Sequence, residues 1–337
     1  MKYTGKIVAL AFPDTFVKGS TDFICKVLPF LGVGTKQYTK AGHAALLLIE
    51  NKTGCIRYFD FGRYVTLPGY GRVRSAQTDA ELIIDFKAVL DGQGALQNID
   101  KILRWIDAHP EKTHGSGRLL ASVCNTIDFK KAETYILNLQ ARGSIPYTLF
   151  EKEGSNCSRL VANTVLEATD TRHIIKRLKF NTLFTPSTVG NVEAASSSGI
   201  VYEVIDNEVR QFKGTALKEN LTNFFDKKYN SILVPHPKAS IPKHLHILQG
   251  IGSSAYFEIV SSVLPTYHYR IKRYNNYLDL DFDGVFVSSE FEKSIPYTFT
   301  YDSHCKFCHV LQDGKKIKMD CIGTFSGFSS SKRAHLT

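Results

Sequence analysis

The sequence predicts an α+β fold in two domains, and three observations lead to this prediction. Short apolar runs typical of buried strands occupy residues 7–12, 43–49 and 55–61. Apolar residues at helical spacing occupy residues 98–109, 128–141 and 157–168. Beyond residue 200, strand-like runs outnumber the single helix expected near residues 217–225. We therefore expect an antiparallel sheet with helices in the first domain and a second, strand-rich α+β domain.

Length and composition fit this layout. A chain of 337 residues can form two domains with real cores, and 43% hydrophobic with 22% charged residues is ordinary for a soluble globular protein. The first residues predict a strand and contain no signal peptide, so we expect synthesis in the cytoplasm and any export by a non-standard route. No apolar run is long enough to span a bilayer. Seven scattered cysteines favour reduced thiols over a disulfide framework.

The formal net charge is +10, which favours anionic partners such as nucleic acid, anionic lipid or cell-wall polymer. The Lys and Arg residues are dispersed, with small clusters at 227–228 and 315–318, and no specific nucleic-acid motif is present. A solvated basic surface is therefore favoured over a dedicated nucleic-acid site.

Two of the early runs form a predicted hairpin around the turn at residues 51–54. If Glu50 pairs with Cys55, His43 and Asp60 become diagonal neighbours on one face, about 7–8 Å apart at Cα. Asp60 could then orient the His43 ring. A bulge at Gly54 would shift the register and move Asp60 to the other face.

The remaining elements follow in order. Residues 16–32 have apolar residues at helical spacing, with Cys25 as a core residue, and the Gly- and Arg-rich residues 63–78 favour a surface loop. We expect a strand over 81–89, a short strand or turn over 119–124, a helix capped by Asp128, and a helical stretch over 173–180. The Ser-rich residues 186–199 predict a linker, which divides the chain into domains 1–190 and 200–337.

A cysteine lies at a predicted helix start. Ser155 or Asn156 can cap the helix that begins at Cys157, because apolar residues such as Leu160 and Val161 follow at helical spacing. In the first turn, the helix dipole and the unpaired N–H groups favour thiolate over thiol. Cys157 is therefore a candidate nucleophile.

These residues also carry a family resemblance. Asn156-Cys157 before an apolar helix, the His43 strand at residues 42–49 and the approach segment 145–150 resemble circularly permuted papain-fold enzymes, the relatives of NlpC-type peptidases and lecithin retinol acyltransferase. In that family the catalytic histidine precedes the cysteine, as it does here. The whole chain also resembles a bacterial family with this two-part layout.

The resemblance implies a permuted papain-like N-terminal domain and a cysteine hydrolase (amidase or peptidase) or acyltransferase. Cys157 would attack an amide or ester carbonyl, His43 would hold the thiol proton, and Asn156 and Tyr147 are candidates for contacts with the oxyanion or substrate. The substrate would be a peptide, a cell-wall peptide or a lipid acyl group. Two alternatives stay open: a non-catalytic binding module that retains the fold, in which Cys157 and His43 are core residues, and a metal-stabilised interaction protein.

The metal alternative depends on residues near the C-terminus. Cys305 and Cys308 have zinc-knuckle spacing, Cys321 returns across an Asp313-Gly314 hairpin, and His304 or His309 could be the fourth ligand. Along a strand, however, Cys305 and Cys308 would point to opposite faces, which favours packed thiols. The C-x-x-C-H pattern also matches haem attachment, which needs export. The acidic run at 279–284 is similar to a calcium loop, but its apolar residues favour a strand-end turn. No other cofactor is expected.

Overall fold

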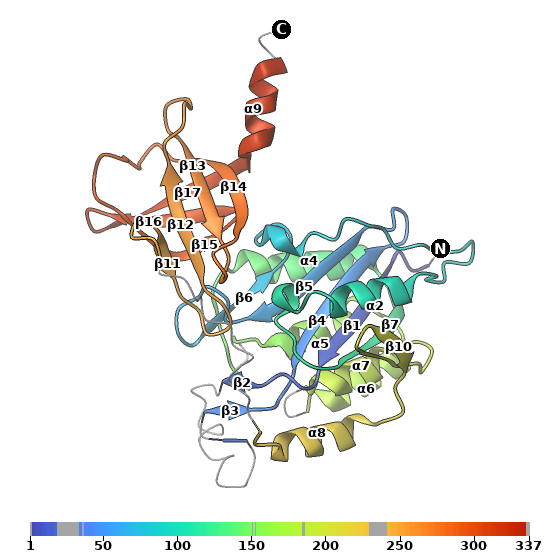
Figure 1. The fold of residues 1–337 in the computed structure, drawn as a ribbon. Coiled ribbons are helices and arrows are strands. Elements are labelled where there is room, and N and C mark those ends of the chain that lie inside the picture. Colours follow the sequence, from blue (N-terminus) through green and yellow to red (C-terminus); the bar gives the residue numbers. More distant parts are fainter. Residues whose placement is uncertain are drawn as a thin grey trace. The chain divides into compact units, whose positions relative to one another are not determined.

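The computed structural model describes residues 2–18, 34–35, 37–149, 151, 153–183, 186–228 and 241–334. It divides into two compact units, shown in Figure 1. The first comprises Met1–Gly62, Gly71–Ser75 and Leu82–Tyr229, and the second comprises Arg63–Tyr70, Ala76–Glu81 and Asn230–Thr337. Both the α+β class and the strand-rich second unit agree with the prediction. The segment predicted as a helix at 16–32 lies mostly outside the described residues.

The first unit is built on an eight-stranded sheet with the order β10-β9-β7-β1-β4-β5-β6-β8. Its strands are β1 (Gly5–Phe12), β4 (His43–Glu50), β5 (Ile56–Gly62), β6 (Tyr70–Arg74), β7 (Leu119–Ile127), β8 (Ile145–Pro146), β9 (Tyr202–Ile205) and β10 (Glu208–Gln211). The short strands β2 (Val17–Lys18) and β3 (Tyr38–Thr39) pair separately. The central pairs β1–β4, β1–β7 and β4–β5 are antiparallel, as expected.

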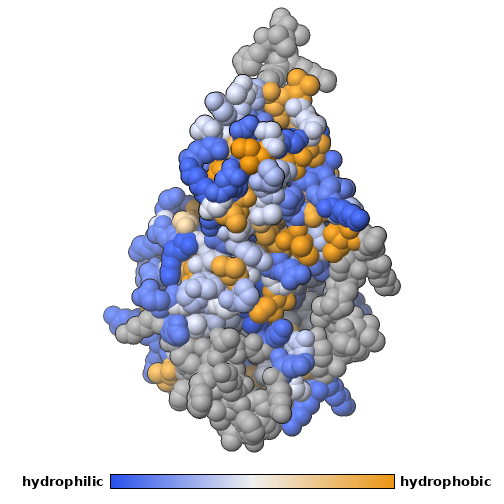
Figure 2. Space-filling model, turned by 90° about the vertical axis from the view of Figure 1, so that its left-hand side faces the viewer, coloured by the Kyte–Doolittle hydropathy of each residue, from blue (hydrophilic) through white to orange (hydrophobic). Residues whose placement is uncertain are grey.

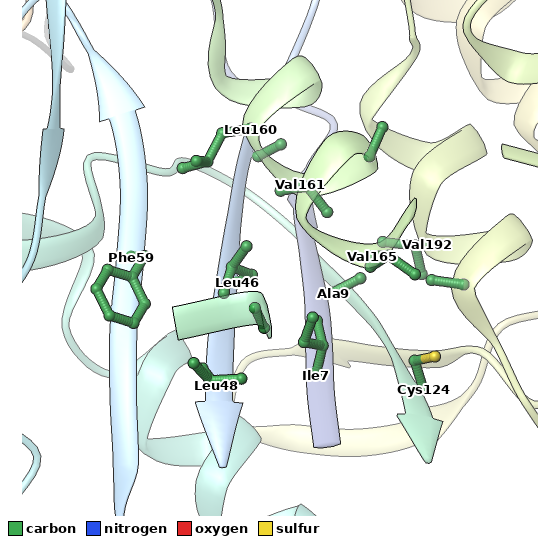
Figure 3. Packing of buried hydrophobic residues seen from close by; sticks show 14 of the residues in the cluster. Ile7, Ala9, Leu46, Leu48, Phe59, Cys124, Leu160, Val161, Val165 and Val192 are labelled. Carbon is green, nitrogen blue, oxygen red and sulfur yellow. The ribbon is translucent and has the colours of Figure 1, made fainter. Parts of the chain in front are cut away.

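Helices cover both faces of this sheet, which explains why every residue of β1 is buried. The helices of the unit are α2 (Ile99–Asp107), α3 (Pro110–Thr113), α4 (Phe129–Ala141), α5 (Cys157–Ala168), α6 (Arg172–Asn181), α7 (Thr188–Ala195) and α8 (Ala216–Phe225). Apolar residues of α4, α5, α6 and α7 share one core cluster with one face of the central strands, and those of α2 share another cluster with the opposite face. Figure 3 shows Leu160, Val161 and Val165 of α5 beside Ile7 and Leu46 of the sheet.

The hairpin register is the predicted one. Ala45 pairs with Asp60 and Ile49 with Ile56, and the Glu50 N–H donates to the Cys55 carbonyl at 3.1 Å. Because the register holds, Asp60 lies on the same face as the first residue of β4, His43.

Three other segments differ from the prediction. Residues 63–78 include β6, which pairs with β5, and residues 81–89 contain the end of a short 3₁₀ helix, η2 (Ala80–Leu82), in place of a strand. The predicted linker contains α7, whose residues are mostly buried. Residues 200–228, assigned to the second domain by the sequence, lie in the first unit, where β9 pairs with β7 and Val204 is buried.

The second unit contains a curved seven-stranded sheet with the order β11-β12-β13-β14-β17-β16-β15. Its elements are β11 (His246–Leu248), β12 (Ala255–Val260), β13 (His268–Tyr274), β14 (Leu280–Val287), β15 (Thr298–His304), β16 (Phe307–Gln312), β17 (Lys315–Thr324) and α9 (Phe325–Ala334). The outer strands β11 and β15 meet, since the rings of His246 and Phe299 are 5.3 Å apart. Asp313 (φ 48°) and Gly314 (φ 74°) form the predicted hairpin turn.

No helix in the described part of the chain is long and apolar enough to cross a bilayer. On the face drawn in Figure 2, polar and apolar side chains are interspersed.

Candidate active site

Cys157 is the first residue of α5, where the sequence placed it. Asn156 is the cap: its backbone is extended, its side-chain oxygen accepts from the Arg159 N–H at 2.9 Å, and its side-chain nitrogen donates to the Thr148 carbonyl at 3.0 Å. Both ends of this amide are therefore used to hold the helix start against the approach segment. The Cys157 side chain is directed into the unit and is 6% exposed.

The approach segment is fixed by the backbone. The Ser155 N–H donates to the Pro146 carbonyl at 3.0 Å, and the Thr148 N–H donates to the Ser155 carbonyl at 3.2 Å. The Tyr147 ring stacks on Phe61 with centroids 5.9 Å apart. Asn156 and Tyr147, the predicted contacts for an oxyanion or substrate, thus have defined structural contacts, and a substrate role for either stays a prediction.

His43 meets Cys157 where β4 begins. The two side chains are hydrogen-bonding partners, and the Cys157 sulfur also accepts from the backbone N–H of Ala44. Phe12, the cross-strand partner of His43, stacks on the imidazole at 6.2 Å between centroids. The imidazole therefore contacts both the Cys157 sulfur and an aromatic ring.

Asp60 is a second polar partner of His43, and the connected side chains of Cys157, His43, Asp60 and Arg74 are called the row below. Its Oδ2 lies 3.5 Å from His43 Nε2, and the Tyr58 hydroxyl donates to the same oxygen at 3.0 Å. Arg74 donates hydrogen bonds to both carboxylate oxygens, with Nε at 3.0 Å from Oδ1 and Nη2 at 2.5 Å from Oδ2. The Asp60 carboxylate is completely buried, and these donors satisfy it.

The electrostatics of the row favour an ion pair at the sulfur. Burial alone would raise the pKa of the Cys157 thiol, but the hydrogen bond and charge of His43 lower it below its usual value. Burial would lower the pKa of His43, but Asp60 and Cys157 raise it to about 9. Burial would also raise the pKa of Asp60, but Arg74 and His43 hold it well below its ordinary range. These directions favour a thiolate–imidazolium pair at Cys157 and His43, beside an ionised Asp60 carboxylate.

Arg74 is the member of this row that the sequence prediction missed. It lies on β6, in the segment predicted as a surface loop, yet it is 1% exposed and also donates to the Lys112 carbonyl at 2.9 Å. A cluster of arginines ordinarily indicates a surface. The available signal was the alternation of Arg72, Val73 and Arg74, which is typical of a strand.

The predicted zinc ligands lie in the second unit, where each has other contacts, and a metal role for them stays a prediction. Cys305 Sγ lies 3.2 Å from Nη1 of the buried Arg273, so a cation already occupies that side of the sulfur. Cys308 is buried in the apolar core of the second unit, and His309 Nδ1 lies 2.5 Å from the Asp302 carbonyl. The Cys321 thiol donates to the Gly323 carbonyl at 3.6 Å. Among the described residues, no group of three or more His, Cys, Asp or Glu side chains is arranged to hold a metal ion.

The cysteines of the described part of the chain are free thiols, as predicted, and Cys25 lies outside that part. The acidic run at 279–284, predicted as a strand-end turn, lies mostly within β14, as the apolar residues in it had indicated.

Comparison with known proteins places the candidate site inside a matched region. Residues 7–174, which include His43, Asp60, Arg74 and Cys157, match the family described as type VI secretion system effector TseH-like. The first half of this chain is similar to TseH-like effectors. We refer to residues 7–174 as the TseH-like region.

Two further comparisons concern the C-terminal part of the chain and a solved structure. Residues 245–322 match the family described as DUF6695 C-terminal domain. A crystal structure of the type VI secretion system effector TseH aligns with 17% identity and a TM-score of 0.40, covering 63% of this chain and 100% of that chain. No curated protein matches the chain.

Proposed function

We propose that the protein is a cysteine hydrolase that cleaves an amide bond, with Cys157 as nucleophile, His43 as acid–base group and Asp60 as the orienting carboxylate. The observation that carries the proposal is the buried row in which the Cys157 thiol, at the start of α5, hydrogen-bonds His43, with Asp60 3.5 Å behind the imidazole. The side chains come from three separate elements, and the permuted papain-like resemblance supports the same roles.

The proposed chemistry follows from these positions. The thiolate attacks the carbonyl carbon, a carbon–sulfur bond forms, and the Cys157 backbone N–H at the helix start donates to the developing oxyanion. The His43 imidazolium gives its proton to the leaving amine as the carbon–nitrogen bond breaks. Neutral His43 then takes a proton from water, which attacks the thioester and releases the acid and the thiol. An acyl acceptor in place of water would give an acyltransferase.

The TseH-like match supports a role as a secreted effector. A type VI effector reaches its target by a dedicated secretion apparatus. Among the substrates that the resemblance implies, we favour a peptide, including a cell-wall peptide, over a lipid acyl group. The basic character of the chain, with a net charge of +10, would favour an anionic polymer carrying that peptide.

The test has two parts. Brief iodoacetamide treatment at about pH 6, where an ordinary thiol is almost wholly protonated, should label Cys157 before the other cysteines. Cys124 is an internal control, because it is buried and burial raises the pKa of its thiol. Purified protein should then release new amino groups from peptidoglycan fragments, and Cys157→Ser should not.

Two results would contradict the proposal. If Cys157 stays unmodified until the protein is denatured, it is a core residue. If Cys157 reacts first but neither peptide nor ester substrates are cleaved, the fold is retained as a non-catalytic binding module.

A further inference from the structure

The row of side chains behind Cys157 does not end at the carboxylate. His43, Asp60 and Arg74 lie on the neighbouring strands β4, β5 and β6. Asp60 is paired with Ala45 on one side and with Arg74 on the other, so its side chain and that of Arg74 share one face of the sheet. A guanidinium is therefore fixed by the strand register directly beside the carboxylate that contacts the histidine.

The contact between Arg74 and Asp60 has a more specific geometry than charge neutralisation alone requires. The guanidinium donates Nε to one carboxylate oxygen and Nη2 to the other, a two-point geometry that fixes the plane of the carboxylate. The same Nη2 donates to the Lys112 carbonyl, which anchors the guanidinium. The oxygen that receives Nη2 and the Tyr58 hydroxyl is also the one nearest His43.

We propose that Arg74 is a positioning residue for the Cys157 site. Its guanidinium holds the Asp60 carboxylate ionised and turned toward His43, and Arg74 so acts on the sulfur through two other side chains. The inference rests on the proposed function. The titratable groups involved are Tyr58 and Asp60 from β5, Arg74 from β6, His43 from β4 and Cys157 from α5.

The sign of the effect follows from counting charges. With Arg74 present, the guanidinium, carboxylate, imidazolium and thiolate sum to zero, and a further proton must enter a neutral buried cluster. Without Arg74 the remaining three groups carry one net negative charge, so the further proton enters at higher pH. Below that pH the His43–Cys157 ion pair is lost. Removing Arg74 should therefore move the acid limb of Cys157 reactivity upward.

The experiment measures the rate of Cys157 alkylation by iodoacetamide from pH 4.5 to 9 in wild type, Arg74→Gln and Arg74→Lys. For Arg74→Gln we expect the acid limb to shift upward by about one pH unit, which is about a tenfold lower rate on that limb, with little change above pH 8.5. Arg74→Lys should shift it less, because an ammonium keeps the charge but loses the two-point grip. Arg57→Gln is the matched control, since Arg57 lies on β5, the strand of Asp60, but pairs with Glu133 of α4. Its profile should follow wild type.

A second comparison separates positioning from a general effect on folding. In an Asp60→Asn background, Arg74→Gln should not lower the rate any further, because the carboxylate through which Arg74 acts is absent. A further tenfold loss there would overturn the inference, as would an Arg74→Gln profile that coincides with wild type. If Arg74→Gln does not fold, as judged by circular dichroism, Arg74→Lys decides, and an unshifted limb overturns the inference. Failure of wild-type Cys157 to react ahead of the other cysteines would instead contradict the proposed function.

Discussion

Cys157 in the first unit and Cys305 in the second are both buried, and each sulfur lies beside a cationic side chain. Burial would raise the pKa of Cys157, but His43 outweighs burial and the pKa is lowered. Burial also raises the pKa of Cys305, and there Arg273 does not outweigh it, so that the pKa is about 12. A neighbouring cation is therefore not sufficient to make a reactive thiol.

The difference lies in what else surrounds each sulfur. Cys157 lies at the start of α5, and its sulfur accepts from the Ala44 N–H of β4. Cys305 lies near Asp79, Glu81 and Asp281, whose charges oppose a thiolate. These three carboxylates also surround Arg273, at 2.9, 3.7 and 3.7 Å respectively, so the guanidinium is largely neutralised before it can act on the sulfur.

The largest expected effect is on the stability of the second unit. Arg273→Met should lower its free energy of unfolding by about 3–5 kcal/mol, because the change leaves buried carboxylates without their counter-charge. Arg270→Met on the same strand should cost only about 1 kcal/mol, since Arg270 and Asp283 are partly exposed. Urea denaturation, monitored by hydrogen exchange of the backbone amides of β13 and β14, would measure the loss of stability in each variant. Equal losses would show that the cluster does not depend on Arg273.

The next effect tests the partner that distinguishes Cys157. His43→Ala should slow alkylation of Cys157 at pH 6 by about 100-fold, because a buried thiol without the imidazolium returns to an ordinary or higher pKa. Labelling of Cys305 should not change. Peptide mass spectrometry after brief exposure to iodoacetamide gives both rates. A Cys157 rate that is independent of His43 would assign the reactivity to the helix start alone.

A pH dependence follows from the carboxylates near Cys305. Burial, opposed by Arg273 and reinforced by Glu81, raises the pKa of Asp281 to about 7. Folding therefore favours the protonated form, and the stability that Asp281 contributes is full below about pH 4 and is lost as the pH rises to about 7. Asp281→Asn should become more stable than wild type by about 1 kcal/mol per pH unit across that window.

Calorimetric unfolding at pH 4, 5.5 and 7 would measure this difference. A stability gap between Asp281→Asn and wild type that stays constant with pH would show that Asp281 is ionised in the folded protein throughout.

The smallest effect concerns Tyr58, one of several donors to Asp60. Tyr58→Phe should slow alkylation of Cys157 at pH 6 by about two- to threefold, because Arg74 still holds both carboxylate oxygens. The measurement is the same alkylation rate, with Arg57→Gln as control. A loss as large as that of His43→Ala would mean that the hydroxyl, and not the guanidinium, fixes the carboxylate.

The sequence by itself determined the features that depend on neighbouring residues. The Asn156 cap and the start of α5 at Cys157 follow from side chains within three positions of one another. The β4–β5 register follows from the short turn at Gly54, which sets His43 and Asp60 on one face. The cap and the hairpin turn each join residues that are close in sequence, so the local sequence largely specifies them.

Only the tertiary structure decided which charges are buried together. The segment around Arg74 was predicted as a surface loop, but β6 pairs with β5 and the Arg74 guanidinium is buried against Asp60. In the same way, β9 joined the first unit by pairing with β7, more than 70 residues earlier in the chain. Cys305 and Cys308 had the spacing of metal ligands, but the guanidinium of Arg273 comes from another strand. The cost of burying a charge depends on partners that are distant in sequence, and the spacing of residues along the chain does not reveal them.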